Sequence, residues 1–121
     1  MKLFIATISS LLLFSCAKKD NLTVSKNNID LKEMLIGNTY VDSILVKNEG
    51  SNNVRVVSVK SPCDCTTVDY PKAKLEPDDS MYLKIVVKPN TVGEFNKEIK
   101  VKTDMVENKE ILIKMKGTVI N

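Results

Sequence analysis

Alternation of apolar and polar residues is the feature that most constrains the fold of this chain. The segment 95–102 reads Phe-Asn-Lys-Glu-Ile-Lys-Val-Lys, and the segment 81–88 alternates in the same way until Pro89 and Asn90. Successive side chains of a β-strand point to opposite faces, whereas an amphipathic helix repeats about every 3.6 residues. The pattern therefore predicts strands with one buried and one solvated face.

Turn-forming residues separate several short segments of this kind. The cluster Asn-Glu-Gly-Ser-Asn-Asn at 48–53 is an example. The segment 31–36 is too short for a stable helix, and we interpret it as a strand with its corner. Short strands between Gly, Pro, Asn and Asp clusters favour an antiparallel sandwich or barrel. The clearest expected strands are 40–47, 54–60, 81–88, 95–102 and 111–119.

The expected core is aliphatic, because the chain has no tryptophan. Burial of one aliphatic side chain contributes roughly 1.5–3 kcal/mol, so about a dozen can hold one small domain. The expected core residues are Ile29, Ile44, Val46, Val54, Val56, Leu83, Ile85, Val87, Ile99, Val101, Ile113 and Met115.

The first fifteen residues have the features of an export signal. A short positive start, Met1-Lys2, precedes a mostly apolar stretch from Leu3 to Phe14. This stretch is too short to remain as a membrane-spanning helix. We therefore predict a signal peptide over residues 1–15.

The signal ends in Leu-Phe-Ser-Cys, with the cysteine at position 16. This ending resembles the bacterial lipobox, in which the cysteine thiol is acylated before cleavage. Phe14 is bulkier than the residue most lipoboxes have there, and the alternative is an ordinary secretory signal. Acyl chains contribute about 0.8 kcal/mol per buried methylene, and two of them anchor a protein stably. We predict a lipid on Cys16, a flexible tether over 16–25 and a folded domain over 26–121.

The order of motifs in the expected domain resembles that of the DUF1573 family of small exported proteins. The most specific match is the pair Cys63 and Cys65 with Thr66, followed by Tyr70 and Pro71. The resemblance covers roughly residues 29–119. It implies an immunoglobulin-like antiparallel β-sandwich of about seven strands, related to the major sperm protein type. The family has no known function, so the resemblance implies no activity.

The sequence departs from the family pattern in two places. Asp64 replaces the glycine that is usual between the two cysteines, and Asp78 replaces a glycine that commonly follows the proline matched to Pro77. Both substitutions keep turn-forming chemistry, so the fold is expected to persist. Asp64 argues against a role that needs positive φ at its position.

The cysteine pair allows three states. Cys63 and Cys65 are the only cysteines besides Cys16, and the chain has no histidine. They can be packed thiols, a small disulfide that closes almost no loop, or a soft-metal or redox pair. Zinc would need four donors, with carboxylates such as Asp64 or Asp69 completing the set, and no second cysteine pair is present. We favour packed structural thiols, and no metal ligand is assigned.

The remaining sequence features give no sign of catalysis or of nucleic-acid binding. Without histidine, general-base chemistry would fall to carboxylates, Lys, Tyr or Cys, and we identify no catalytic residue. The 18 basic and 15 acidic residues alternate along the chain without forming a basic cluster. Ser43 and Ser80 lie in Asp-Ser-apolar triplets that some bacteria O-glycosylate. No cofactor and no small-molecule substrate are indicated beyond the covalent lipid.

The expected function is a non-catalytic interaction or structural module of the bacterial cell envelope. The lipid would hold it to the inner membrane or to either face of the outer membrane. An envelope protein could bind along a sheet edge, since exposed edges accept an added strand. The alternative function is thiol-redox or copper handling through Cys63 and Cys65.

Overall fold

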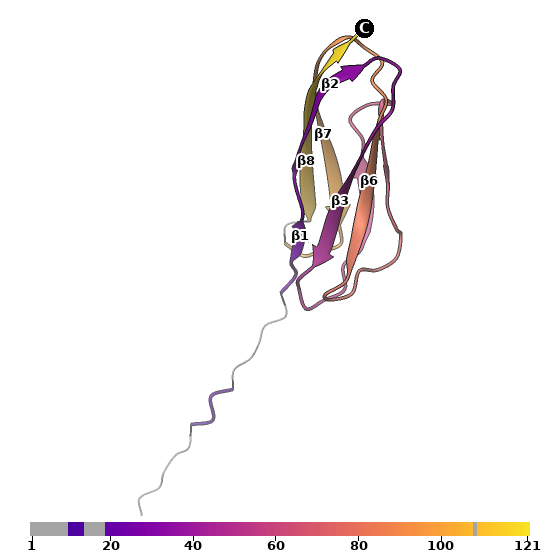
Figure 1. Ribbon diagram of the computed structural model, residues 1–121. Coiled ribbons are helices and arrows are strands. Elements are labelled where there is room, and N and C mark those ends of the chain that lie inside the picture. Colours follow the sequence, from indigo (N-terminus) through magenta and orange to yellow (C-terminus); the bar gives the residue numbers. More distant parts are fainter. Residues whose placement is uncertain (1–9, 14–18, 108) are drawn as a thin grey trace, which may run out of the picture.

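The computed structural model describes residues 10–13, 19–107 and 109–121 (Figure 1). It contains eight strands and confirms the all-β class. They are β1 (Leu22–Val24), β2 (Asn28–Leu35), β3 (Tyr40–Asn48), β4 (Val56–Lys60), β5 (Thr66–Asp69), β6 (Ser80–Val87), β7 (Gly93–Thr103) and β8 (Glu110–Ile120).

The strands form two four-stranded sheets that pack as a sandwich. One sheet has the order β1-β3-β6-β5 and the other has the order β2-β8-β7-β4. Every pairing between these strands is antiparallel except that of β2 with β8, in which Ile29 lies opposite Met115 in parallel. The expected antiparallel sandwich of about seven strands is therefore confirmed, with one additional strand and one parallel pair.

The core agrees closely with the alternation pattern. All twelve of the expected core residues are buried. The cluster also includes Met34, Leu75, Met81 and Phe95, which complete the layer between the sheets. Residues 31–35 of the segment that we interpreted as a strand with its corner belong to β2, and Ile36 lies in the turn that follows.

A bulge interrupts β2 between Asp30 and Glu33. Lys32 in this bulge has a φ of 55°, and its carbonyl lies against Gly117 of β8. A Cβ atom at Gly117 would lie 2.8 Å from the Lys32 oxygen, which is closer than real contacts allow. Glycine at position 117 therefore makes the close approach of the bulge possible.

The predicted tether 16–25 needs correction, because part of it belongs to the domain. Strand β1 pairs with the end of β3, with Leu22 opposite Asn48. Before it, the carbonyls of Lys19 and Asn21 accept hydrogen bonds from Ser51 and Glu49 at 3.0 and 2.9 Å. The folded domain thus begins by Lys19, earlier than the predicted boundary at 26.

Gly50 explains why this N-terminal segment can lie so close to the turn after β3. A Cβ atom at Gly50 would lie 2.6 Å from both the Asn21 nitrogen and the Lys19 oxygen. Both contacts are with backbone atoms, which cannot move aside as a flexible side chain can. Only glycine leaves room for the chain here.

The sandwich has two distinct ends. The N-terminal segment enters at one end, beside the β3–β4 turn and the β7–β8 connection, where Val106 N donates to Asp20. The chain ends at the other, where Leu35 of β2 lies opposite Ile120 of β8 (Figure 1). The β4–β5 loop with both cysteines also lies at this second end, since Lys88 N donates to the Cys65 carbonyl.

Candidate functional site

The cysteine pair lies in a tight turn between the two sheets. β4 ends at Lys60 and β5 begins at Thr66, so residues 61–65 cross from one sheet to the other. The turn closes where Thr66 N donates to the Cys63 carbonyl across 3.2 Å. Asp64 has no positive φ, so the glycine that the family usually places there is not required by the backbone.

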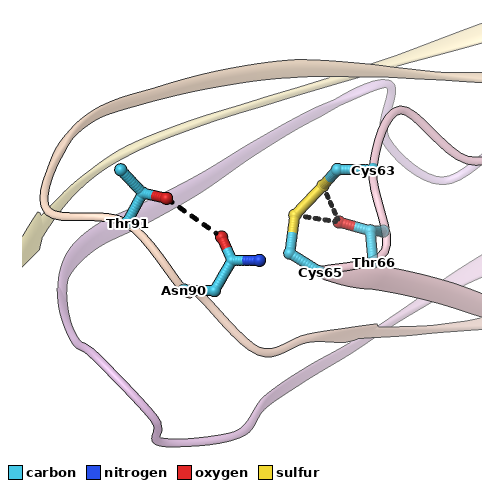
Figure 2. Close-up of a disulfide and its surroundings, with 5 residues drawn as sticks. All are labelled: Cys63, Cys65, Thr66, Asn90 and Thr91. Atoms are coloured by element: carbon cyan, nitrogen blue, oxygen red, sulfur yellow. Dashed lines mark hydrogen bonds between the residues drawn. A yellow bond between two sulfur atoms is a disulfide. The ribbon is translucent and has the colours of Figure 1, made fainter.

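Cys63 and Cys65 form a disulfide in the structure (Figure 2). Their Cα atoms are 5.1 Å apart, within the usual disulfide range and shorter than the roughly 6.6 Å of an extended i, i+2 pair. The turn at residues 61–65 brings the two Cα atoms closer together than an extended strand would. Of the three states that the sequence left open, the structure has the disulfide rather than the packed thiols that we favoured.

The two cysteine residues differ in exposure. Cys65 is buried, with 7% of its surface exposed, and its carbonyl is fixed by Lys88 N at 2.7 Å. Cys63 is only partly buried and packs against the edge of the core. An external reactant therefore reaches Cys63 more readily than Cys65.

Thr66 places its hydroxyl between the two sulfurs. Its Oγ1 atom lies 3.6 Å from Cys65 Sγ and 3.7 Å from Cys63 Sγ, as the dashed lines in Figure 2 show. The Thr66 residue is 2% exposed, and among the described residues its side chain has these two sulfurs as hydrogen-bond partners. A buried hydroxyl requires a partner, and here the disulfide provides it.

A hollow of about 230 Å³ opens beside the disulfide. The β6–β7 loop forms its other wall, and Figure 2 shows the Asn90 and Thr91 side chains of that loop facing the disulfide side. Thr91 Oγ1 donates to Asn90 Oδ1 at 3.2 Å. Polar groups therefore line the space into which a ligand of the disulfide would fit.

Lys97 and Glu94 of β7 add charges to the hollow. Lys97 lies on the same face of β7 as Phe95 and Ile99, which are buried, yet Lys97 itself is exposed. The reason is that β4 reaches only as far as the pair Lys60–Lys100, so the sandwich is open on this side. The alternation pattern alone gives no signal that position 97 would face the cysteines.

The same early end of β4 leaves part of β7 with an open edge. Residues 93–99 of β7 pair with β8 on one side, but β4 covers only Lys100–Thr103 on the other. No backbone hydrogen bond from the rest of the described chain reaches this stretch on its second side. It is a seven-residue strand edge next to the disulfide.

A zinc ion at the pair would need further ligands beside the two cysteines. In residues 10–13, 19–107 and 109–121, no three Cys, Asp or Glu side chains gather as metal ligands would. Asp64 and Asp69, the carboxylates considered for zinc, form no such group with the cysteines. In addition, the sulfurs of a disulfide are not thiolates, which are the metal-binding form of cysteine.

The other predicted site residues lie apart from the disulfide. Cys16, the predicted lipidation site, is outside the described residues. Within those residues no helix has the length and apolar character needed to span a membrane. Ser43 and Ser80 are exposed on β3 and β6, so both remain sterically available as glycosylation sites.

Solved structures with the same sandwich come from distant organisms. A protein of unknown function from Porphyromonas gingivalis W83 has a TM-score of 0.72 at 19% identity, over 90% of this chain and 51% of that one. This chain therefore spans about half the length of that protein. PapD-like domain 7 of human CEP192 has a TM-score of 0.69 at 12% identity, over 83% and 85% of the two chains.

A third relative connects the fold to major sperm proteins. WR4, a C. elegans MSP family member, has a TM-score of 0.57 at 14% identity, over 80% of this chain and 97% of that one. At such identities the likeness establishes the fold alone, which is the PapD- and MSP-like immunoglobulin sandwich. No curated protein matches the chain.

The family model for DUF1573, described as a protein of unknown function, matches residues 22–119. The match includes β1, the Cys63–Cys65 turn and nearly all of β8. It extends further toward the N-terminus than the resemblance seen in the sequence motifs, in agreement with the position of β1. The chain belongs to the DUF1573 family.

Proposed function

We propose that the protein is a lipid-anchored, non-catalytic interaction module of the bacterial cell envelope. The lipobox-like ending at Cys16 supports the anchor, and the open edge of β7 supports the interaction. The observation that carries the proposal is that Lys19, three residues after Cys16 in the sequence, lies at one end of the sandwich, whereas the open stretch of β7 begins at the other end.

The anchor would be short and would orient the domain. Only residues 17 and 18 separate Cys16 from Lys19, whose carbonyl is hydrogen-bonded to Ser51. Asp20 adds side-chain contacts, accepting from Asn52 Nδ2 at 2.8 Å and from Val106 N at 3.2 Å. A lipid on Cys16 would therefore keep the N-terminal end of the sandwich near the membrane. The disulfide end would face away from it, by roughly the length of β7, about 35 Å at 3.3 Å per residue.

The open stretch of β7 is the best of the available edges for a partner strand. The edge strands β2 and β4 each have a register shift, and β1 and β5 have only three and four residues. The open part of β3 is blocked, because the Asp42 carboxylate already accepts the Ser43 N–H. Residues 93–99 of β7 pair regularly with β8, and a partner segment added there would extend the sheet.

Charged residues on this edge would select the partner. Lys97 and Glu98 lie on the open stretch, whereas Lys114 and Lys116 of β8 are paired on both sides. Lys97 and Glu98 can therefore protect an exposed strand edge, whereas Lys114 and Lys116 cannot. Charges on an edge discourage indiscriminate strand pairing, so the proposed partner offers a complementary charge pattern.

Acylation is tested with the full-length chain in a bacterium that exports it. Cells are grown with an alkyne-bearing fatty acid, and the protein is examined for label and for sedimentation with membranes. The protein with the natural sequence should carry the label and sediment, whereas the Cys16→Ser variant should do neither. Ser15→Ala keeps a small residue before the cysteine and serves as the matched control. Label on the Cys16→Ser variant, or no label on the protein with the natural sequence, would refute the anchor.

Partner binding is tested with a photo-crosslinking amino acid at position 98, and at position 116 as control. We expect a specific envelope protein to crosslink at 98 and not at 116. A synthetic peptide that covers the crosslinked segment should then slow amide exchange in residues 93–99. Exchange that is unchanged there while the peptide binds would contradict strand addition at β7.

A further inference from the structure

We propose that the Cys63–Cys65 disulfide is a thiol-exchange site for a cysteine of a partner protein. This function goes beyond non-covalent strand addition and does not depend on the lipid. It rests on four observations: the ring that the disulfide closes, the unequal exposure of its two cysteine residues, the buried Thr66 hydroxyl and the adjoining hollow.

The first observation is that this disulfide contributes little to stability by closing a loop. A disulfide stabilises mainly by restricting the unfolded chain, and the effect grows with the number of residues enclosed. Here one residue, Asp64, separates the two cysteines. The turn is also held without the disulfide, by the Thr66 N to Cys63 O and Lys88 N to Cys65 O hydrogen bonds. The disulfide therefore adds little to the stability of the folded turn.

The second observation fixes the direction of the reaction. A thiolate attacks one sulfur of a disulfide and expels the other as a new thiolate. The partner's thiolate would attack Cys63 Sγ, because Cys63 is the more exposed of the two residues. The S–S bond breaks, its electron pair stays on Cys65 Sγ, and a mixed disulfide joins the partner's cysteine to Cys63.

The third observation is a hydrogen-bond donor for the Cys65 thiolate that attack on Cys63 would release. An unassisted buried thiolate would be costly, because burial disfavours the charged form. Thr66 Oγ1 lies 3.6 Å from Cys65 Sγ and can direct its proton to that sulfur. A hydrogen bond to an ionised acceptor is shorter and stronger than one to a neutral acceptor. The contact is therefore weak in the disulfide and strengthens as the thiolate develops.

The fourth observation concerns the hollow, which gives the partner a place to lie. Its wall opposite the disulfide is the β6–β7 loop, and its charges come from Lys97 and Glu94. The Lys97 ammonium favours a nearby thiolate and the Glu94 carboxylate opposes it, while Asp64 adds a further negative charge within the turn. The hollow adjoins the open edge of β7, so a strand added there would bring a neighbouring cysteine to Cys63.

A second thiol of the partner completes the reaction. It attacks the partner's own sulfur in the mixed disulfide and releases Cys63 as a thiolate, which takes up a proton. The partner then holds a disulfide, and Cys63 and Cys65 hold two thiols. Two electrons have passed from the partner's dithiol to this chain, so the substrate class is a protein dithiol.

The test uses the mature protein purified in detergent without reductant, with glutathione as the thiol probe. After brief exposure, free thiols are alkylated at acidic pH and the adducts are located by mass spectrometry. We expect glutathione on Cys63 and the alkyl group on Cys65 in folded protein. Glutathione on Cys65, a disulfide that opens only after unfolding, or two free thiols before any treatment would each overturn the proposal.

Variants separate the proposed chemistry from a structural role. Thr66→Val removes the hydroxyl and should slow the opening of the disulfide by about tenfold, the loss of one hydrogen bond to a charged sulfur. Thr66→Ser should restore the rate, and both variants should keep the thermal midpoint within a few degrees of the unmodified protein. An equal rate in Thr66→Val and the unmodified protein would remove the role assigned to Thr66. If Thr66→Val does not fold, adduct mapping on the unmodified chain still decides which sulfur is attacked.

Cys65→Ser and Cys63→Ser form the matched pair for finding the partner. Cys65→Ser keeps the exposed thiol at 63 and lacks the sulfur that would reverse a mixed disulfide. Its Cys63 thiolate would attack the disulfide form of the partner, the product of the proposed reaction, and release one partner thiolate. It should therefore accumulate reductant-sensitive adducts in the envelope, whereas Cys63→Ser, with a buried thiol, should form several-fold fewer. Equal yields from the two variants would contradict attack at Cys63. Non-covalent binding at β7 should survive in the double serine variant, which distinguishes failure of this proposal from failure of the interaction module.

Discussion

The side-chain amide of Asn48 donates to the main-chain carbonyl of Leu75 across 2.8 Å, joining segments 27 residues apart. Asn48 is fully buried at the end of β3. Its Nδ2 atom also donates to the Asn52 carbonyl, and its Oδ1 atom accepts from Gly50 N. One side chain therefore satisfies three backbone groups of two loops.

This relationship predicts a large loss of stability for Asn48→Leu. The substitution keeps the approximate volume but leaves Gly50 N and Asn52 O without their side-chain partner, each costing about 1–3 kcal/mol, and leaves Leu75 O with the Val54 N–H alone. We expect the free energy of unfolding to fall by at least about 2 kcal/mol in urea titrations. Asn53→Leu is the control, because Asn53 is exposed in the same turn and should change stability little. Similar losses in both variants would show that the turn as a whole, and not the buried amide, is sensitive.

Asp78 provides a test of backbone strain. Its φ is 68°, in the left-handed region that glycine adopts without cost and that Asp and Asn tolerate. We expect Asp78→Gly to leave stability unchanged or raise it, and Asp78→Val to lower it by about 1–2 kcal/mol, since a β-branched residue is disfavoured there. The measurement is the thermal midpoint of both variants beside Asp79→Val, the adjacent control without a positive φ. Equal effects at 78 and 79 would contradict a strained backbone at 78.

The core and the disulfide site differ in how far the sequence predicted them. Burial follows from a period of two, so Ile44, Leu83 and Ile99 could be assigned to the core from the alternation alone. The parallel pairing of β2 with β8 could not be predicted in this way. Alternation tells which face of a strand is buried and not which strand lies beside it. Strand β1 was missed for a related reason, since three residues are too few to show a period.

The site depends on contacts that local sequence does not encode. Thr66 follows Cys65 directly and was part of the recognised motif, but Asn90 and Lys97 reach the hollow only through the topology. Sheet register also collects charges that alternate along the chain. Lys60 of β4 lies opposite Lys100 of β7, next to Lys102. These three lysines therefore lie together on the outer face of the β2-β8-β7-β4 sheet, which the linear pattern did not indicate.

The N-terminal segment should be sensitive to acid through Asp20. Hydrogen bonds from the Asn52 side chain and the Val106 N–H hold the pKa of the Asp20 carboxyl below its usual value, against a smaller opposing effect of desolvation. A lowered folded-state pKa means that the stabilisation is present above the unfolded pKa, near about pH 4, and is lost as the pH falls through the folded value. We expect amide exchange in residues 19–24 to rise below about pH 4 in the unmodified protein, after correction for the intrinsic exchange rate. In Asp20→Asn the corrected rate should vary less with pH, and a pH dependence equal to that of the unmodified protein would assign the effect to another carboxyl.

The last prediction concerns the pair that closes the edge of β3. The Asp42 carboxylate accepts from Ser43 N at 2.8 Å and is held by Lys26 Nζ at 2.8 and 2.6 Å. The pair lies at the surface, so its own contribution to stability is small, roughly 0–1 kcal/mol. Its larger effect is to occupy a backbone donor that would otherwise template another strand. Asp42→Ala should therefore leave the thermal midpoint nearly unchanged and promote self-association at high protein concentration, measured by analytical ultracentrifugation. Asp69→Ala, a change of the same charge on the strand β5 edge, is the control, and dimerisation of both variants to the same extent would attribute the effect to net charge rather than to the freed Ser43 N–H.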